Sequence, residues 1–284
     1  DNYSSFIVGD RQISATGIKY SPPSSVTLGL VNFFRQAGTL EAWRGVASFY
    51  NRPGMELHMF AMFTGFSSPL VPFCGENRGG ILNLYSDESG TGKTTMLKVI
   101  NSIFGHPEDL MLIKSDTMNS RISRIGAMQN ITPTIDEITN EPPEVTSDFL
   151  YDFLQARGKN RLKHSHNIER INTTTWKSNC VVTANAPLED KLYINKRSPD
   201  GELARFLDIE YHPGNTLSKT ESDAVFNPLK TNYGWAGDVY MQYVIQNLPE
   251  IIKLLDKMQQ SIDKAAGLTQ RERHWSGLTV TPLV

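Results

Sequence analysis

Residues 86–95, SDESGTGKTT, have the residue types and the spacing of a loop that binds phosphate. The usual pattern is G-x-x-x-x-G-K-[ST], and DESGTGKT differs only at its first position, where Asp87 replaces glycine. Lys93 would neutralise charge on the γ-phosphate of a nucleotide, and the Thr94 hydroxyl would be a ligand of Mg²⁺. The alternative is a chance match on a surface loop. The expected nucleotide-binding residues are Ser89, Gly90, Thr91, Gly92, Lys93, Thr94 and Thr95.

A pair of carboxylates ends the mainly apolar stretch ITPTIDE, residues 131–137. Asp136 and Glu137 stand at the C-terminal end of an expected strand, which is where open α/β sheets bind their ligands. Asp136 would hold the water shell of the Mg²⁺ ion, and Glu137 would be the general base that polarises an attacking water. The alternative is an acidic strand end that caps the following helix.

Two more polar residues lie at strand boundaries. Asn185 ends the β-branched stretch SNCVVTAN and would hold the attacking water through its amide, unless it is only a turn residue before Pro187. Arg205, in DGELARFLDIEY, lies where a short helix meets a strand, from which it would reach the nucleotide of a neighbouring subunit. Such an arginine accelerates hydrolysis by about 10³–10⁵-fold where it is known. Arg197 competes for this role, and a surface arginine over the sheet edge is the alternative.

Charge is segregated along the middle of the chain. Residues 136–152 carry six acidic residues and no basic one, whereas residues 157–177 carry six basic residues against one acidic residue. The basic segment is expected to contact a nucleic-acid backbone through Arg161, Lys163 and His164. The alternative is a solvated basic loop.

The elements that must position these residues alternate between strand and helix. Helices are expected at residues 92–105, 117–130, 142–157 and 198–206. Strands are expected at residues 81–86, 110–115, 131–137, 178–185 and 207–211. The alternation predicts an α/β fold with a five-stranded, mainly parallel sheet that is covered on both faces.

The composition is that of an ordinary globular chain, with 284 residues, 39% apolar residues and 20% charged residues. A net charge of only −2 means that affinity for nucleic acid must come from a local patch. Two distant cysteines and six histidines without paired spacing argue against a disulfide framework and a zinc site. No long apolar run and no signal peptide are visible, which predicts a cytoplasmic protein without a membrane partner. The first residue is aspartate, as expected of a fragment of something longer.

The order SDESGTGKTT, TIDE, VVTAN, LARFLDIEY resembles the core of an AAA+ ATPase. It is most similar to the superfamily 3 helicase-like domain of phage and mobile-element primase–helicase proteins, over about residues 40–284. The resemblance implies a first nucleotide motif at Lys93 and Thr94 and a second at Asp136 and Glu137. Asn185 would be the first sensor and Arg205 the arginine finger.

The same resemblance implies the domain organisation. Residues 1–70 would form a lead-in and a helical collar, residues 71–212 a P-loop ATPase core, and residues 213–284 a helical lid. Superfamily 3 helicases carry a β-hairpin at the position of residues 157–177, which grips nucleic acid in the channel of a ring. Arg271 or Arg273 would be a second sensor.

The expected function is therefore ATP hydrolysis with Mg²⁺, coupled to translocation on single-stranded DNA and to unwinding in phage or mobile-element replication. The expected partners are single-stranded DNA, other copies of the chain in a hexameric ring, and a primase or polymerase domain. The expected location is the cytoplasm of a bacterial host. One alternative is an AAA+ remodeller or loader that acts on protein, and another is an ATP-gated DNA-binding scaffold for a primase.

Overall fold

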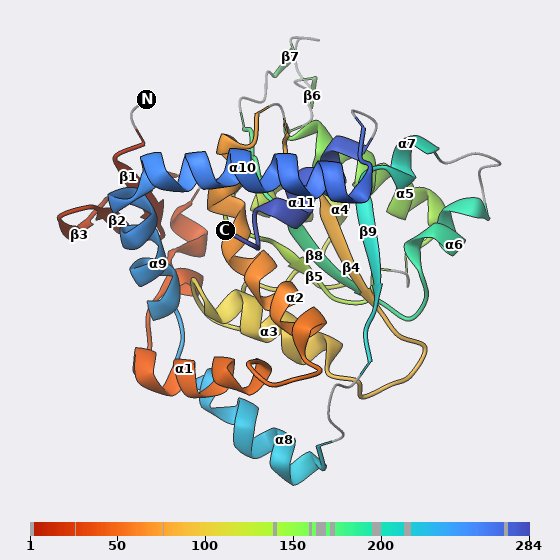
Figure 1. The fold of residues 1–284 in the computed structure, drawn as a ribbon. Coiled ribbons are helices and arrows are strands. Elements are labelled where there is room, and N and C mark those ends of the chain that lie inside the picture. The colour runs from red at the N-terminus through yellow and green to blue at the C-terminus, as the bar shows by residue number, and fades with distance from the viewer. Residues whose placement is uncertain are drawn as a thin grey trace.

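The centre of the fold is a parallel sheet of four strands in the order β5-β8-β4-β9 (Figure 1). The strands are β4 Ile81–Tyr85, β5 Thr134–Ile135, β8 Cys180–Ala184 and β9 Phe206–Glu210. The computed structural model describes residues 3–25, 27–75, 77–138, 141–158, 161–162, 169–170, 174–194, 200–212, 217–269 and 272–284. The α/β class with a parallel sheet, predicted from the alternation of strands and helices, is confirmed.

Most of the remaining structure is helical. The α-helices are α1 Leu40–Ala47, α2 Glu56–Ser67, α3 Lys93–Ser102, α4 Met118–Met128, α5 Pro143–Gln155, α6 Leu188–Tyr193, α7 Asp200–Leu203, α8 Lys219–Phe226, α9 Trp235–Gln246, α10 Leu248–Ala266 and α11 Arg273–Val280. Short 3-10 helices are η1 Leu28–Phe34, η2 Ser48–Tyr50, η3 Ser68–Phe73 and η5 Asn227–Lys230. The expected helices near residues 92–105, 117–130 and 142–157 correspond to α3, α4 and α5.

Helices cover both faces of the sheet, because alternate residues of the buried strands point to opposite sides. Leu82 and Leu84 of β4 and Val181 of β8 belong to one buried cluster, with side chains from α2, α3, α9 and α11. Ile81 and Val182 belong to a second cluster, with side chains from α4, α5 and α6. The near-continuous apolar stretches of β4 and β8 thus reflect burial on both faces.

The described residues contain four strands in this sheet rather than the five that the sequence predicts. At residues 110–115 there is only an isolated parallel bridge between Leu112 and Ile135. The Leu112 N–H donates to the Thr134 carbonyl at 2.9 Å, and the Asp136 N–H donates to the Leu112 carbonyl at 3.2 Å. Leu112 is fully buried. Its apolar stretch therefore signals burial, and the pairing is too short to make a strand.

The carboxylate strand is also shorter than residues 131–137, because β5 contains only Thr134 and Ile135. Pro133 precedes it and has no N–H to give to a neighbouring strand. Its carbonyl still accepts from the Val181 N–H at 3.1 Å. The proline therefore shortens the strand without moving the carboxylates away from its C-terminal end.

The N-terminal lead-in forms an antiparallel sheet of β1 Ser5–Val8, β2 Arg11–Ser14 and β3 Gly17–Tyr20. Arg11 joins it to α9, with Nε donating to Asp238 Oδ2 at 2.8 Å and Nη2 donating to Oδ1 at 3.0 Å. Val8 and Ile13 share a buried cluster with side chains of the central and C-terminal helices. The domain boundaries at residues 70 and 212 stay a prediction.

A small pair of strands, β6 Arg161–Leu162 and β7 Glu169–Arg170, stands out from the body of the molecule (Figure 1). The two strands are antiparallel, with Arg161 opposite Arg170. An antiparallel bridge between Arg157 and Thr175 continues the pairing toward the body. The expected nucleic-acid contacts Lys163 and His164 lie outside the described residues.

Candidate functional site

The glycine-rich loop joins the C-terminal end of β4 to the first turn of α3. Gly90 has a φ of +79° and Gly92 a φ of +91°, the left-handed region that favours glycine. A Cβ at either position would meet no atom within 4 Å. Glycine is therefore favoured at both positions by the positive φ angle, and not by a lack of space for a side chain. Gly92 precedes α3 directly, so the loop lies at the positive end of the helix and beside its unpaired N–H groups.

The Lys93 ammonium folds back over this loop. Its Nζ donates to the carbonyl of Ser86 at 2.8 Å and to the carbonyl of Glu88 at 3.2 Å. Burial lowers the pKa of Lys93, and the nearby carboxylates of Asp136 and Glu137 partly oppose that shift. The loop therefore holds a partly desolvated cation, which is suited to a charge-assisted hydrogen bond with an anion.

The Asp136 carboxylate links the loop helix to two strands. The Thr94 hydroxyl donates to it and lies 3.2 Å from each carboxylate oxygen. The Thr183 hydroxyl, from β8, donates to Asp136 Oδ1 at 2.6 Å and accepts from the Glu137 N–H at 2.9 Å. Two hydroxyls thus fix the carboxylate between α3 and the sheet.

Thr183 is a site residue that the sequence analysis did not identify. It lies in a buried β-branched stretch, where threonine is an ordinary strand residue. Only the parallel pairing of β5 with β8 brings its hydroxyl to Asp136. The one signal in the sequence is its position, two residues before Asn185.

Glu137 and Asn185 are both exposed at the C-terminal edge of the sheet. Glu137 has a φ of +55°, a left-handed conformation that is uncommon for a residue other than glycine. The chain therefore makes a sharp turn at Glu137, immediately after Asp136. Because β8 lies between β5 and β4, Asn185 leaves the sheet between the carboxylates and the glycine loop.

Arg205 lies at the amino-terminal end of the parallel strands, directly before β9. Its carbonyl accepts from the Ile81 N–H at 3.2 Å, at the start of β4. The five residues of β9 span roughly 16 Å at about 3.3 Å per residue, so Arg205 is remote from the loop of its own chain. Its guanidinium carbon lies 4.3 Å from the centre of the Tyr151 ring. Its Nη1 atom is buried without a hydrogen-bond partner in the part of the chain that the structure describes.

Of the other arginines considered for the site, only Arg273 belongs to the described residues. Arg197 and Arg271 lie outside the described residues. Arg273 is exposed at the start of α11. Trp275 of the same helix donates to the carbonyl of Phe206 at 2.7 Å, which ties α11 to the start of β9. Arg273 therefore lies toward the same edge as Arg205.

A cavity of about 210 Å³ opens directly beside the glycine loop. One wall is the loop itself, from Glu88 to Gly92. The others come from η2, α2, the residue after β9 and α8. Its aromatic side chains are Phe49, Tyr50, His58, Tyr211 and Phe226. The sequence analysis identified none of them, because they come from four separate segments. We name this hollow the loop cavity.

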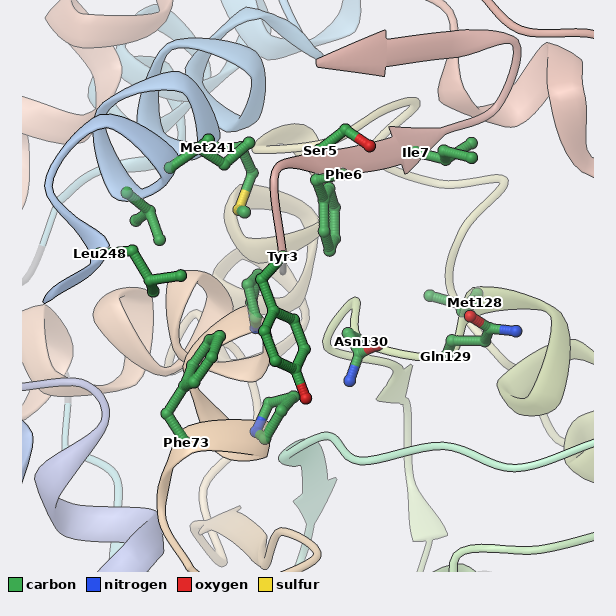
Figure 2. Close-up of a pocket in the computed structure, with 14 residues that line it drawn as sticks. Tyr3, Ser5, Phe6, Ile7, Phe73, Met128, Gln129, Asn130, Met241 and Leu248 are labelled. Carbon is green, nitrogen blue, oxygen red and sulfur yellow. The ribbon is translucent and has the colours of Figure 1, made fainter. Parts of the chain in front are cut away.

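A second and larger cavity, of about 270 Å³, lies among β1, η3, the end of α4 and α9 (Figure 2). None of its 14 lining residues carries a charge. Figure 2 shows the rings of Tyr3, Phe6 and Phe73 on one side and the amides of Gln129 and Asn130 on another. η3 precedes β4 and Asn130 precedes β5, so this hollow, the apolar cavity, lies near the amino ends of the strands.

Two searches over the described residues gave negative results. No group of three or more histidine, cysteine, aspartate or glutamate side chains there is placed to hold a metal ion. Nor does that part of the chain contain a helix long and apolar enough to cross a bilayer. Cys74 and Cys180 are buried free thiols.

Residues 1–173 match the protein family described as Domain of unknown function (DUF927). Among curated proteins, the chain has no match. Among solved structures it is similar to the active helicase Cch of SCCmec type IV, with 17% identity and a TM-score of 0.71. The similarity covers 97% of this chain and 54% of that one, so this chain spans about half the length of Cch. At this identity the likeness shows a shared fold.

Two structures of the C-terminal region of NrS-1 also match. Their identities are 13% and 12%, and their TM-scores are 0.37 and 0.36. The matches cover 98% and 96% of this chain and 69% of each NrS-1 chain. Scores this low support no conclusion about fold or function.

Proposed function

This chain belongs to the DUF927 family, a domain of unknown function, and from that premise we propose a function based on its site. The site binds and hydrolyses ATP and couples hydrolysis to movement along single-stranded DNA. The observation that carries the proposal is the contact between Thr94, directly after Lys93, and the Asp136 carboxylate. It joins a glycine-rich loop, which follows β4, to the carboxylate strand β5 across one intervening strand, β8, of the parallel sheet.

The loop would bind the phosphates. Backbone N–H groups of residues 89–94, at the N-terminus of α3, offer donors to an anion. In the described structure, the Lys93 ammonium donates hydrogen bonds to the carbonyls of Ser86 and Glu88. A phosphate oxygen would draw the ammonium off these carbonyls, because a charged acceptor makes the stronger hydrogen bond.

The hydroxyl of Thr94 and the carboxylate of Asp136 fit a Mg²⁺ ion. Both offer oxygen atoms, which this ion prefers, and Mg²⁺ with nucleotides uses only one or two protein carboxylates. When bound, Mg²⁺ would neutralise phosphate charge.

Glu137 and Asn185 would handle the attacking water. Both are exposed where β5 and β8 end, next to the loop. Glu137 would accept the proton of the water, and the Asn185 amide would orient it. Thr183 bonds the Asp136 side chain and the Glu137 backbone together, so it would position both carboxylates.

Arg205 would act on the site of a neighbouring copy. It lies at the far edge of its own sheet, so it becomes useful for hydrolysis only in an assembly. This supports a ring, and a hexamer is the ring that the resemblance to superfamily 3 helicases implies. An arginine that enters from a neighbour makes hydrolysis depend on assembly.

The DNA would be held by the hairpin of β6 and β7, through Arg161, Lys163 and His164. The hairpin lies in a segment with six basic residues and one acidic residue, as expected for contacts to phosphates. The fold shared with Cch, an active helicase, supports a role in unwinding. We place the protein in the cytoplasm of a bacterial host, in phage or mobile-element replication, with a primase or polymerase domain as partner.

The test is ATP hydrolysis with and without single-stranded DNA, at low and high salt, with Glu137→Gln as the inactive control. The expected result is hydrolysis that DNA stimulates, that loses this stimulation in high salt, and that disappears in the variant. Hydrolysis indifferent to DNA would contradict translocation and favour a protein remodeller. No hydrolysis by the assembled protein would contradict the motor and favour an ATP-gated scaffold.

A further inference from the structure

The walls of the loop cavity contain a cluster of aromatic side chains that pack against one another. The ring centres of His58 and Tyr211 are 4.4 Å apart, and those of Phe49 and Phe226 are 5.3 Å apart. Tyr50 lies 5.9 Å from Phe226 and stacks parallel to His58 at 6.0 Å. Aromatic side chains of this kind bind nucleobases by stacking.

The cavity is continuous with the glycine loop, since Ser89, Thr91 and Thr95 also line it. A molecule whose phosphates lie on the loop would therefore place its next chemical group in the aromatic hollow. For a nucleotide that group is the nucleoside. This inference rests on the proposed function, because it assumes that the loop binds a nucleoside triphosphate.

Two residues that line this cavity each have a buried polar atom with no hydrogen-bond partner among the described residues. The atoms are His58 Nδ1 and Thr91 Oγ1, and each side chain is only 7% exposed. A buried polar atom without a partner destabilises a fold, so native structures seldom keep one without reason. Both residues line the same hollow, which is the arrangement expected where a ligand completes the hydrogen bonds.

The protonation of His58 decides which ligand group fits it. Burial lowers the pKa of His58, while a hydrogen bond with the backbone of His212 acts in the opposite direction. A backbone bond that raises the pKa is one that the imidazole donates. The nitrogen that meets His212 therefore carries the hydrogen in the neutral ring. Nδ1, which has no partner, is then a hydrogen-bond acceptor.

We propose that His58 selects adenine in the loop cavity, with Nδ1 accepting a hydrogen bond from the exocyclic amino group of the base. Guanine carries a carbonyl oxygen at the equivalent ring position, so an acceptor would face an acceptor. A site that is built to bond one group rejects the analogue that lacks it, because its buried atom stays unpaired. The Thr91 hydroxyl, which can donate or accept, bonds the same nucleoside from the loop side.

The experiment measures binding of ATP, GTP and inorganic tripolyphosphate, each with Mg²⁺, to the wild-type chain and to His58→Phe. Phenylalanine keeps an aromatic ring and removes the acceptor. We expect the wild-type chain to prefer ATP over GTP by about tenfold or more, and the variant to bind both equally. The affinity for tripolyphosphate stays unchanged. His106→Phe is the matched control, since His106 contacts Asp109 and does not line the cavity, and it keeps the preference.

Comparing the three compounds separates the proposed phosphate loop from the proposed selection of adenine. If the wild-type chain binds none of the three compounds, the phosphate loop itself fails. If it binds tripolyphosphate and does not distinguish ATP from GTP, the loop stands and the selection of adenine is wrong. A preference that survives in His58→Phe also overturns the role of His58.

A second measurement needs no variant and so does not depend on whether His58→Phe folds. ATP methylated twice on its exocyclic nitrogen has no donor there, and we expect the wild-type chain to bind it about as weakly as GTP. Binding equal to that of ATP would overturn the hydrogen bond to Nδ1.

Discussion

Two cavities in the part of the chain that the structure describes differ in the polarity of their linings, and the larger one is the less polar. The apolar cavity is the larger, at about 270 Å³ against about 210 Å³, and has no charged residue in its lining. The loop cavity is lined by the glycine loop, and two of its lining residues, His58 and Thr91, each have a buried polar atom without a partner among the described residues. Convergent polar groups mark a binding site better than volume does.

The difference follows from the direction of the strands. All four strands of the central sheet are parallel, so their C-terminal ends deliver loops to one edge. Ser86, Asp136, Asn185 and Tyr211 each follow a different strand at that edge. The amino ends are covered by apolar segments such as β1 and η3, and there a hollow is left by packing.

The largest effect is expected from a substitution of Arg205, which lies at the amino-terminal end of the strands. We expect Arg205→Ala to reduce ATP hydrolysis by roughly 10³–10⁵-fold with little change in ATP affinity, because in the proposed mechanism the guanidinium would act only on a neighbour's site. Mixing Arg205→Ala subunits with Lys93→Ala subunits should restore part of the activity, since mixed interfaces pair an intact arginine with an intact loop. Mixtures as inactive as either variant would contradict action between subunits.

Glu137→Gln tests the carboxyl edge. We expect hydrolysis to fall by about 10²–10⁴-fold while ATP still binds, because the amide cannot accept a proton from water. The measurement is a single-turnover rate beside a binding titration. A neighbouring acid, Glu141, is paired with Arg121 at 2.7 Å, and Glu141→Gln is expected to lower stability without this selective loss of rate.

Thr183→Val tests whether the carboxyl edge depends on the hydroxyl that contacts Asp136 and Glu137. Valine keeps the shape and removes the hydroxyl that bonds Asp136 at 2.6 Å and the Glu137 N–H at 2.9 Å. We expect hydrolysis to fall by about tenfold, and the free energy of unfolding to fall by about 1–3 kcal/mol, because a donor and a carboxylate lose partners. The control is Thr64→Val, which removes a buried hydroxyl bonded to the Phe60 carbonyl. Equal rates for the two variants would exclude a positioning role for Thr183.

Val244→Leu tests the apolar cavity and has the smallest expected effect. It adds one methylene to a residue that is 3% exposed and lines that hollow. We expect the free energy of unfolding to rise by up to about 0.8 kcal/mol, as measured by denaturant unfolding, with ATP affinity and hydrolysis unchanged. A loss of ATP binding would show that the two cavities are coupled and would break the contrast.

The sequence by itself determined the local features of this protein. The glycine loop, the start of α3 after Gly92 and the adjacent pair Asp136 and Glu137 were all predicted from short patterns. Such features depend on the φ angles that glycine permits and on apolar spacing over a few residues. The α/β class followed as well, because alternating buried strands and amphipathic helices leave few other arrangements.

The tertiary structure alone decided which distant residues meet. The apolar stretch around Leu112 could not be assigned from its residues, because burial and strand pairing favour the same side chains. Thr183 reaches Asp136 only through the parallel register of β5 and β8. The loop cavity needs three parts of the chain that are far apart, residues 49–58, 88–95 and 211–226. These outcomes depend on contacts of long sequence separation, which no short window of residues contains.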